Sequence, residues 1–303
     1  MDISQDVKDS FLFIKNHKSV PVLVFSSTLV FIIIVISFLY QAGFLSIIKE
    51  HILNPDLKDA AFDKKIEGLF TMQNIVLLII HIAAIIFISY YLGCATFALV
   101  ALGIKKQHLS TAAVMGATNR LLLRFLLLYI LMLLIVAAPI IAAVLVVAAS
   151  FLISKVLGIL LIILAVLAAI VYIGFMSMKL LFAIPIMMLE DYSAASSIKQ
   201  SFAATKGRMK DVGIIFLIVF AISMAVGYAG NSVGSGILSL IKNRAFSTAT
   251  SGVSLIVYYA IQSIVTSFIY AFLFHAYIDL KNDARPAKSL NKRKQKQGHE
   301  AKG

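Results

Sequence analysis

Residues 121–147 read LLLRFLLLYILMLLIVAAPIIAAVLVV, a run in which Arg124 is the only charged side chain. A helix that crosses a membrane needs about 20 mainly apolar residues, because the hydrocarbon core is about 30 Å thick and each helical residue rises about 1.5 Å. This run is long enough, and its helix would be hydrophobic on every side, which is typical of a helix surrounded by lipid. It therefore predicts a membrane-spanning helix.

Five further stretches have the same character. Hydrophobic residues make up 61% of the 303 residues and charged residues 14%, against about 45–50% and 25% in soluble domains. A water-soluble globule is excluded. We predict an all-α, polytopic membrane helical bundle with six transmembrane helices, at about 20–42, 75–104, 121–147, 156–180, 212–230 and 253–278.

Lysines and arginines predict the orientation of the spans, since loops on the cytoplasmic side carry an excess of both. With the N-terminus in the cytoplasm, 20 of the 27 basic residues fall on the cytoplasmic side and seven on the other. The first external loop also carries five acidic residues. We expect a multi-pass cell-membrane protein with both termini in the cytoplasm.

The segment before the fifth span has the pattern of an amphipathic helix that lies on the membrane surface. Ser193 is a candidate N-cap, because its hydroxyl can accept from the first unpaired backbone amides, and Gly207 is a natural stop. Between them, one helical face carries the apolar positions at i, i+3 and i+4 spacing. These positions are Ala194, Ala195, Ile198, Phe202 and Thr205.

Two other segments resemble this one. Residues 7–15 align with 198–206 without a gap and share four of nine residues, and a fainter copy lies at 110–118. If these segments are repeats, the chain consists of three units, each an interfacial helix followed by two spans. Alternatively, the likeness reflects only the lysines beside Phe and Ile that any interfacial helix shows. We divide the chain into a cytoplasmic amphipathic helix (1–19), a six-span membrane domain (20–280) and a basic disordered cytoplasmic tail (281–303).

The junction of the fourth and fifth spans carries a recognisable signature. PIMMLEDYS at 185–193, IKQSF at 198–202 and TKGR at 205–208 resemble the signature of a broad group of prokaryotic, largely archaeal, membrane proteins. That group is similar to the membrane domain attached to some glycerophosphoryl diester phosphodiesterases. The resemblance implies a six-span domain. It does not imply phosphodiesterase activity, because the hydrolase is a separate soluble domain for which the six spans leave no room here.

We expect no catalytic residue, no cofactor and no metal site. Asp, Glu, Lys and Arg at the bilayer centre cost about 2.5–3.5 kcal/mol each and are usually kept for function, and the deep positions of the predicted spans hold none. His81, well inside the second span, is either a hydrogen-bonded packing residue or a candidate intramembrane polar site. His275 and Asp279, four residues apart, share a helix face, as in a catalytic pair or an ordinary surface pair.

Two other groups are candidate sites. Lys199, Lys206, Arg208 and Lys210 are candidate contacts for lipid headgroups, or form a solvated helix terminus. In the glycine-rich end of the fifth span, Gly230 and Gly234 have the GxxxG spacing that lets helices approach closely. The alternative there is a broken helix that lines a cavity, as in transporters.

These features favour an integral membrane protein without catalytic activity that organises the membrane, contacts lipids or acts as an accessory scaffold subunit. The alternative is a permease or channel-like transporter, and the third candidate is a lipid-modifying membrane enzyme. The expected partners are anionic inner-leaflet headgroups, with protein partners or a second copy as further candidates. Five basic residues between 288 and 296 suit headgroup contact, and the tail is less suited to nucleic acid or a ribosome because it has no aromatic side chain to stack on bases.

Overall fold

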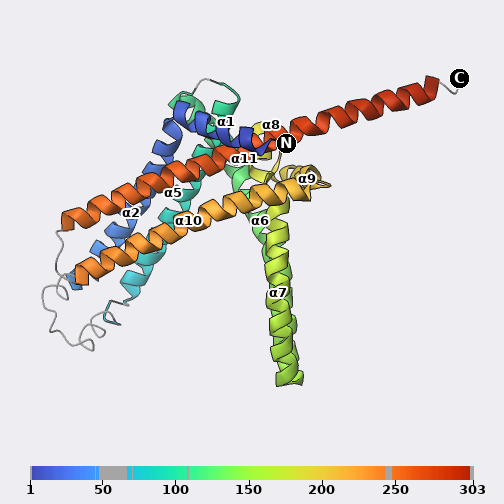
Figure 1. The fold of residues 1–303 in the computed structure, drawn as a ribbon. Helices are drawn as coiled ribbons and strands as arrows, with labels where there is room; N and C mark the ends of the chain where they lie inside the picture. Colours follow the sequence, from blue (N-terminus) through green and yellow to red (C-terminus); the bar gives the residue numbers. More distant parts are fainter. Residues whose placement is uncertain are drawn as a thin grey trace.

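The computed structural model describes residues 2–44, 46–47, 67–69, 71–107, 109–242 and 248–300, and their side chains outside 231–255 and 284–300. Over these residues the chain forms helices joined by short turns, without a β-strand. The helices in chain order (Figure 1) are α1 (Ile3–Asn16), α2 (Ser19–Gln41), α5 (Met72–Ile104), α6 (Thr111–Ile153), α7 (Lys155–Leu180), α8 (Ala183–Glu190), α9 (Ala194–Thr205), α10 (Met209–Lys242) and α11 (Thr248–Glu300).

Six stretches of the described helices are long and apolar enough to cross a membrane. They lie in α2, α5, α6, α7 with α8, α10 and α11, and mean hydropathy in their most apolar windows runs from 1.6 to 3.2. The predicted all-α, six-span architecture is therefore confirmed. The helices of the third, fifth and sixth spans extend beyond the predicted limits, because helix continues past the hydrophobic run.

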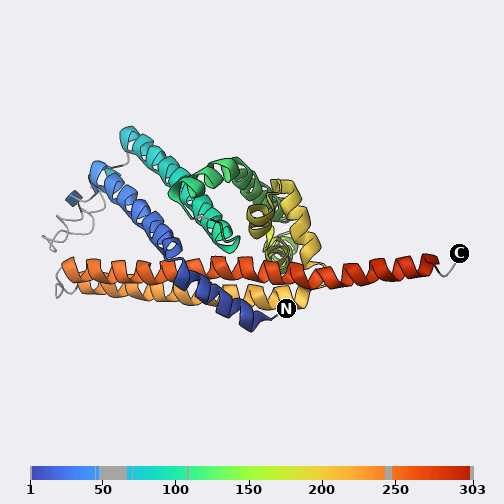
Figure 2. The same ribbon diagram turned by 90° about the horizontal axis from the view of Figure 1, so that it is seen from above.

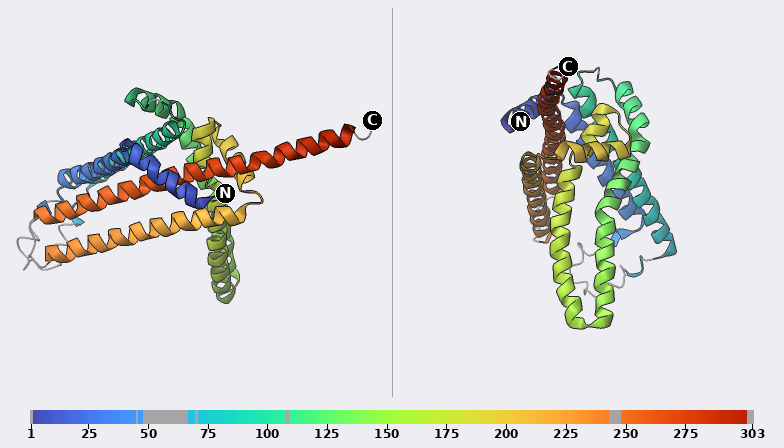
Figure 3. Two further views of the ribbon diagram at one scale, coloured as in Figure 1. Left: turned by 45° about the horizontal axis from the view of Figure 1, so that its top comes forward. Right: turned by 90° about the vertical axis from the view of Figure 1, so that its right-hand side faces the viewer.

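The long helices extend in two directions from one region of the molecule, which contains α1, α8 and α9 and is called the junction below. α2 packs against α5 and α10 against α11. α2, α5, α10 and the first part of α11 lean to the same side of the molecule, and α11 then continues to the opposite side (Figures 1 and 2). The α6–α7 hairpin leaves the junction at a steep angle to them (Figures 1 and 3). α1, α8 and α9 lie at the junction, where α2, α6, α7 and α10 begin or end and which α11 passes.

The buried core is concentrated at this junction. Phe125, Phe182, Phe272 and Phe274 are among its largest fully buried side chains. Farther along the α6–α7 hairpin the large apolar side chains are exposed, as at Leu152 (90%). In a bilayer these side chains would meet hydrocarbon, so their exposure needs no protein partner.

Tyrosine hydroxyls tie three pairs of neighbouring long helices together. Each donates a hydrogen bond to a backbone carbonyl of the next helix, which joins two helices without burying a charge. The bonds are Tyr90 to Leu122 at 2.7 Å, Tyr172 to Ile135 at 2.6 Å and Tyr258 to Val226 at 3.3 Å.

The segments expected to form surface helices differ among themselves. The fainter copy at 110–118 is not a separate helix, because α6 begins there and continues unbroken into the third span. The Ser110 hydroxyl accepts from the amide of Ala113 at 3.1 Å and caps that long helix. The N-terminal segment does form a separate helix, α1, which packs along α11.

The side of α9 that meets the bundle only partly coincides with the predicted apolar face, which it shares at Ala194 and Thr205. Its buried residues are Ala194, Ser197, Ser201 and Thr205, whereas Ile198 and Phe202 are half-buried at its edge. Small hydroxyl side chains can be buried here because each donates to a backbone carbonyl. Ser197 bonds to Ser193 at 2.9 Å, and Ser201 bonds to Lys179 at 2.7 Å.

Helix α11 continues past the sixth span into the basic tail. Its backbone is helical to Glu300, and the last three residues lie outside the described part. Lysine, arginine and glutamine are good helix formers, so a helix already started by the sixth span can propagate into this sequence without a nucleation cost.

Candidate functional site

A tight turn between α8 and α9 lies at the centre of the junction. Asp191 follows the last residue of α8 in the left-handed region, with φ of 58°. Its amide donates to the carbonyl of Met187 at 3.1 Å, which closes the helix end. Aspartate tolerates this conformation better than most residues with a side chain. The Ser193 hydroxyl then accepts from the amide of Ser196 at 3.4 Å, so its predicted role as N-cap is confirmed.

Basic residues from α6 and from the end of α5 bind this turn. Arg124 Nη1 lies 2.9 Å from Asp191 Oδ1 and 3.3 Å from the Asp191 carbonyl oxygen. Arg120 Nη1 lies 3.7 Å from Asp191 Oδ2. Lys105 Nζ donates to the carbonyl of Met188 at 3.4 Å. These cations therefore complement the negative end of the α8 dipole as well as the carboxylate.

Burial lowers the pKa of Lys105, and the neighbouring carboxylate of Asp191 opposes that shift. Arg120 adds to the lowering and Glu190 acts against it. The lysine is thus held by the same acidic turn that Arg124 binds. The turn joins α5, α6 and α8 through charge.

Glu190, the last residue of α8, joins the turn to α11 on the other side. Its carboxylate accepts from the hydroxyl of Tyr277 and lies 2.6 Å from Lys281 Nζ. The side chain of Glu190 is 18% exposed and that of Lys281 38%. Because Tyr277 and Lys281 are four residues apart, they lie on one face of α11.

The turn between α9 and α10 completes this end of the molecule. Gly207 adopts φ of 77°, which confirms it as the stop after α9. Arg208 follows, and its Nη1 donates to the carbonyl of Leu280 in α11 at 2.7 Å. The arginine is therefore positioned between the start of α10 and the side of α11.

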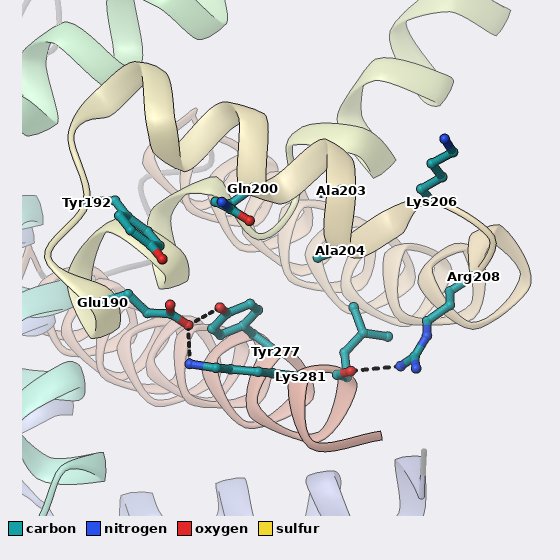
Figure 4. A pocket seen from close by; sticks show the side chains of 10 residues that line it. Glu190, Tyr192, Gln200, Ala203, Ala204, Lys206, Arg208, Tyr277 and Lys281 are labelled. Carbon is teal, nitrogen blue, oxygen red and sulfur yellow. Dashed lines mark hydrogen bonds and ion pairs between the residues drawn. The ribbon is translucent and has the colours of Figure 1, made fainter. Parts of the chain in front are cut away.

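A cavity of about 470 Å³ lies between α9 and α11. Figure 4 shows Glu190, Tyr277 and Lys281 linked on one side of it, with Tyr192 beside Glu190 and Gln200 opposite Tyr277. Arg208 lies on the other side, and Lys206 is at the rim with its side chain pointing outward. Its wall is completed by the small side chains of α9 and one leucine of α11. All the lining residues are Glu190, Tyr192, Gln200, Ala203, Ala204, Lys206, Arg208, Tyr277, Leu280 and Lys281.

The cavity lies at the depth where three spans end. The span that includes α7 and α8 ends at Glu190, that of α10 begins at Met209, and that of α11 ends at Asp283. In a bilayer this is the level of the headgroups, where lysine and arginine side chains normally lie. Its lining residues include three cations and one carboxylate. Such an arrangement can bind an anionic group.

The structure places two of the four predicted headgroup contacts at this cavity. Lys206 and Arg208 line it, whereas Lys199 and Lys210 are exposed and do not. Sequence reasoning missed Glu190, Tyr277 and Lys281. In the described sequence Glu190 and Asp191 form an acidic pair inside the signature motif, and Tyr277 and Lys281 are four residues apart on the sixth span. Neither pattern shows that these residues meet.

The other predicted sites lie elsewhere. His81 Nδ1 lies 2.8 Å from the Leu77 carbonyl of its own helix, and its ring is 5.5 Å from that of Phe38 in α2. Gly230 lies directly against the phenol ring of Tyr258, so that α10 and α11 approach closely there. Gly234 belongs to α10, but its surroundings are outside the described side chains.

His275 and Asp279 face α1. The His275 ring lies 6.1 Å from that of Phe13. Asp6 of α1 is 3% exposed, and its Oδ2 has no hydrogen-bond partner among the described groups. Burial, with the nearby carboxylates of Asp279, Asp9 and Asp2, raises the pKa of Asp6 to about 7. The interface of α1 and α11 therefore holds a carboxyl group whose pKa is raised in the folded protein to about 7.

Comparison with known proteins identifies one family. Residues 148–301 match the family model described as the membrane domain of glycerophosphoryl diester phosphodiesterase. The match covers slightly more than half of the 303 residues and extends over α7 to α11, which supply every lining residue of the cavity. No curated protein and no solved structure matched the chain.

Proposed function

Because the chain belongs to the family of glycerophosphoryl diester phosphodiesterase membrane domains, we propose that it is a lipid-contacting membrane protein without catalytic activity of its own. In this account it organises the membrane or serves as an accessory scaffold, and the end of the bundle that carries α8 and α9 meets the phospholipid headgroups. The family match and the six apolar helices establish an integral, multi-pass membrane protein. The finer role is our inference.

The observation that carries the proposal is the use of charge at this end of the molecule. Asp191 is bound by Arg124, and Glu190 is bound by Lys281. The first pair joins α6 to the turn between α8 and α9, and the second joins the end of α8 to α11. The cavity beside them keeps Lys206 and Arg208 at headgroup depth. This arrangement suits a rigid platform for anionic lipid.

The transporter alternative loses one of its supports. It relied on a broken fifth span whose free carbonyls would line a path, but the backbone of α10 is continuous from Met209 to Lys242. At Gly230 the space beside the small residue is occupied by Tyr258 of α11. The described part of the glycine-rich segment therefore favours helix packing.

We place the α8–α9 end in the cytoplasm. The sequence supports this orientation through the division of basic residues, 20 on the proposed cytoplasmic side against seven on the other. Lys105, Arg120, Arg124, Arg208 and Lys281 of the described junction all belong to the larger group. Anionic lipids of the inner leaflet would then meet the basic end of the bundle.

Thermal unfolding of the detergent-solubilised protein tests the proposal. Phosphatidylglycerol should raise the melting temperature more than the same amount of phosphatidylcholine, and high salt should reduce the difference, because charge attraction near a surface is screened. Equal effects of both lipids at low and high salt would contradict lipid contact through charge. Incubation with a glycerophosphodiester provides the second test, because release of the alcohol would contradict the absence of catalysis.

A further inference from the structure

We propose that the cavity between α9 and α11 binds the phosphate group of one phospholipid headgroup, with Arg208 supplying positive charge inside it and the lysine side chain of Lys206 reaching the phosphate from the rim. The proposal rests on the proposed function and specifies its ligand. It assigns lipid binding to one defined cavity and not to the basic membrane-facing surface as a whole.

The charges of the lining residues favour an anion. Lys206, Arg208 and Lys281 are opposed by Glu190 alone. Glu190 is bound by Lys281 and Tyr277, so that pair is close to neutral and contributes rigidity. The positive charges of Arg208 and Lys206 remain on the opposite side. Asp283 is near enough to Arg208 to offset part of its charge, but it does not line the cavity.

Arg208 is held in place for such a role. One of its guanidinium nitrogens donates to the Leu280 carbonyl at 2.7 Å, which fixes the side chain between two helices. A guanidinium has five N–H donors in a fixed plane, so one bond to a carbonyl leaves several for a phosphate. Arginine is well suited to phosphate because two of its donors can bind two oxygens at once. Its position is therefore set before a ligand arrives.

Neutral donors complete the site. Figure 4 shows the side chains of Gln200 and Tyr192 facing the cavity from α9 and from the turn before it. An amide and a phenol can each donate a hydrogen bond to a phosphate or glycerol oxygen. Ala203 and Ala204 leave the space that a larger side chain would fill.

Volume and depth identify the ligand as a lipid. The cavity of about 470 Å³ is within the range of about 300–1,000 Å³ typical of sites for small molecules. It lies where the spans of α7–α8, α10 and α11 end. A headgroup at this depth can enter the cavity while its acyl chains stay beside the exposed apolar faces of the helices. Free phosphate shares the chemistry but would gain nothing from this depth.

The experiment is a titration of the delipidated, full-length protein in detergent, followed by native mass spectrometry. The probes are phosphatidylglycerol, diacylglycerol as the equivalent lipid without phosphate, and inorganic phosphate as a competitor. Two variants alter the cavity. The double variant Lys206→Gln, Arg208→Gln removes two of its positive charges, and Ala203→Phe fills the space without changing a charge. The matched control is Lys199→Gln with Lys210→Gln, which removes the same charge from exposed positions outside the cavity.

We expect phosphatidylglycerol to bind and diacylglycerol not to compete. Both cavity variants should weaken binding by about tenfold or more, since each loses charged hydrogen bonds or the space for them. The control should weaken it by less than about threefold, as exposed charges contribute little. Ala203→Phe leaves the Arg208–Leu280 bond in place, so its effect cannot be attributed to loss of that contact.

Three results would overturn the cavity site. They are equal losses in the two double variants, full binding by Ala203→Phe, and displacement of the lipid by inorganic phosphate at similar concentrations. Each of these would leave the broader proposal standing, because the wild type would still bind anionic lipid or phosphate. If phosphatidylglycerol bound the wild type no better than phosphatidylcholine, the proposed function itself would fail.

Discussion

The hydroxyl of Tyr172 in α7 donates a 2.6 Å hydrogen bond to the carbonyl of Ile135 in α6. Four residues after Ile135 stands Pro139, inside the unbroken helix α6. Proline has no amide hydrogen, so it cannot supply the i to i−4 bond that this carbonyl would normally accept. In a membrane there is no water to take its place. Tyr172 therefore satisfies the one carbonyl that the proline leaves unpaired.

Replacing Tyr172 with phenylalanine should destabilise the protein by about 1–3 kcal/mol, the usual cost of leaving a buried polar group without a partner. In a Pro139→Ala background the same replacement should cost clearly less, because the introduced alanine would supply the missing amide. A thermal or denaturant unfolding series on the four proteins of this cycle measures the coupling. An equal cost of Tyr172→Phe in both backgrounds would show that the hydroxyl does not compensate for the proline.

Gly230 and Gly227 provide a matched pair for helix packing. A Cβ at Gly230 would collide with the Tyr258 phenol, whereas one at Gly227 would meet nothing within 4 Å. Gly230→Ala should therefore lower stability by about 1–3 kcal/mol through overpacking, and Gly227→Ala should not. In a Tyr258→Leu background the effect of Gly230→Ala should shrink. If both glycine variants melt like the wild type, α10 and α11 are not in close contact there.

Asp6 predicts a pH dependence of folding. Its pKa is raised from 3.8 to about 7 in the folded protein, first by burial and then by Asp279, Asp9 and Asp2, while the amino terminus acts in the opposite direction. Between these two values the folded state holds a proton that the unfolded state releases. Stability should therefore fall as pH rises from about 4 to about 7 and then level off.

Melting temperatures measured from about pH 5 to 8 check this effect. Asp6→Asn should remove this fall and stabilise the protein at the upper end of the range. Asp9→Asn should keep the fall but move it to lower pH, since one repelling charge is lost. The same pH dependence in the wild type and in Asp6→Asn would contradict the raised pKa of Asp6.

Topology can be tested with single cysteines, because the native Cys94 is fully buried. Ser289→Cys in the tail should react with a membrane-impermeant thiol reagent only after the cells are permeabilised. Ser154→Cys, at the exposed turn between α6 and α7, should react in intact cells. The reverse pattern would place both termini outside and would remove the proposed link to inner-leaflet lipids.

Features that depend on neighbours in the sequence could be predicted from it, and those that depend on distant residues could not. Long apolar runs determine spans, and a serine before a helix or a glycine after it determines a cap, so Ser193 and Gly207 were predictable. The contact of Glu190 with Lys281 joins residues 91 positions apart, and no local pattern encodes it. The burial of Ser197 and Ser201 on α9 was missed, because the hydroxyl of Ser201 is satisfied by the end of α7, a partner that periodicity does not reveal.

If the α8–α9 end of the bundle holds anionic phospholipid in the membrane, that lipid should stay with the purified protein. A mass-spectrometric inventory of the lipids that co-purify with the full-length protein in mild detergent, compared with those of the whole membrane, measures this. We expect enrichment of anionic phospholipids with the wild type and loss of that enrichment with the Lys206→Gln, Arg208→Gln variant. Co-purified lipids with the same composition as the whole membrane would contradict this expectation.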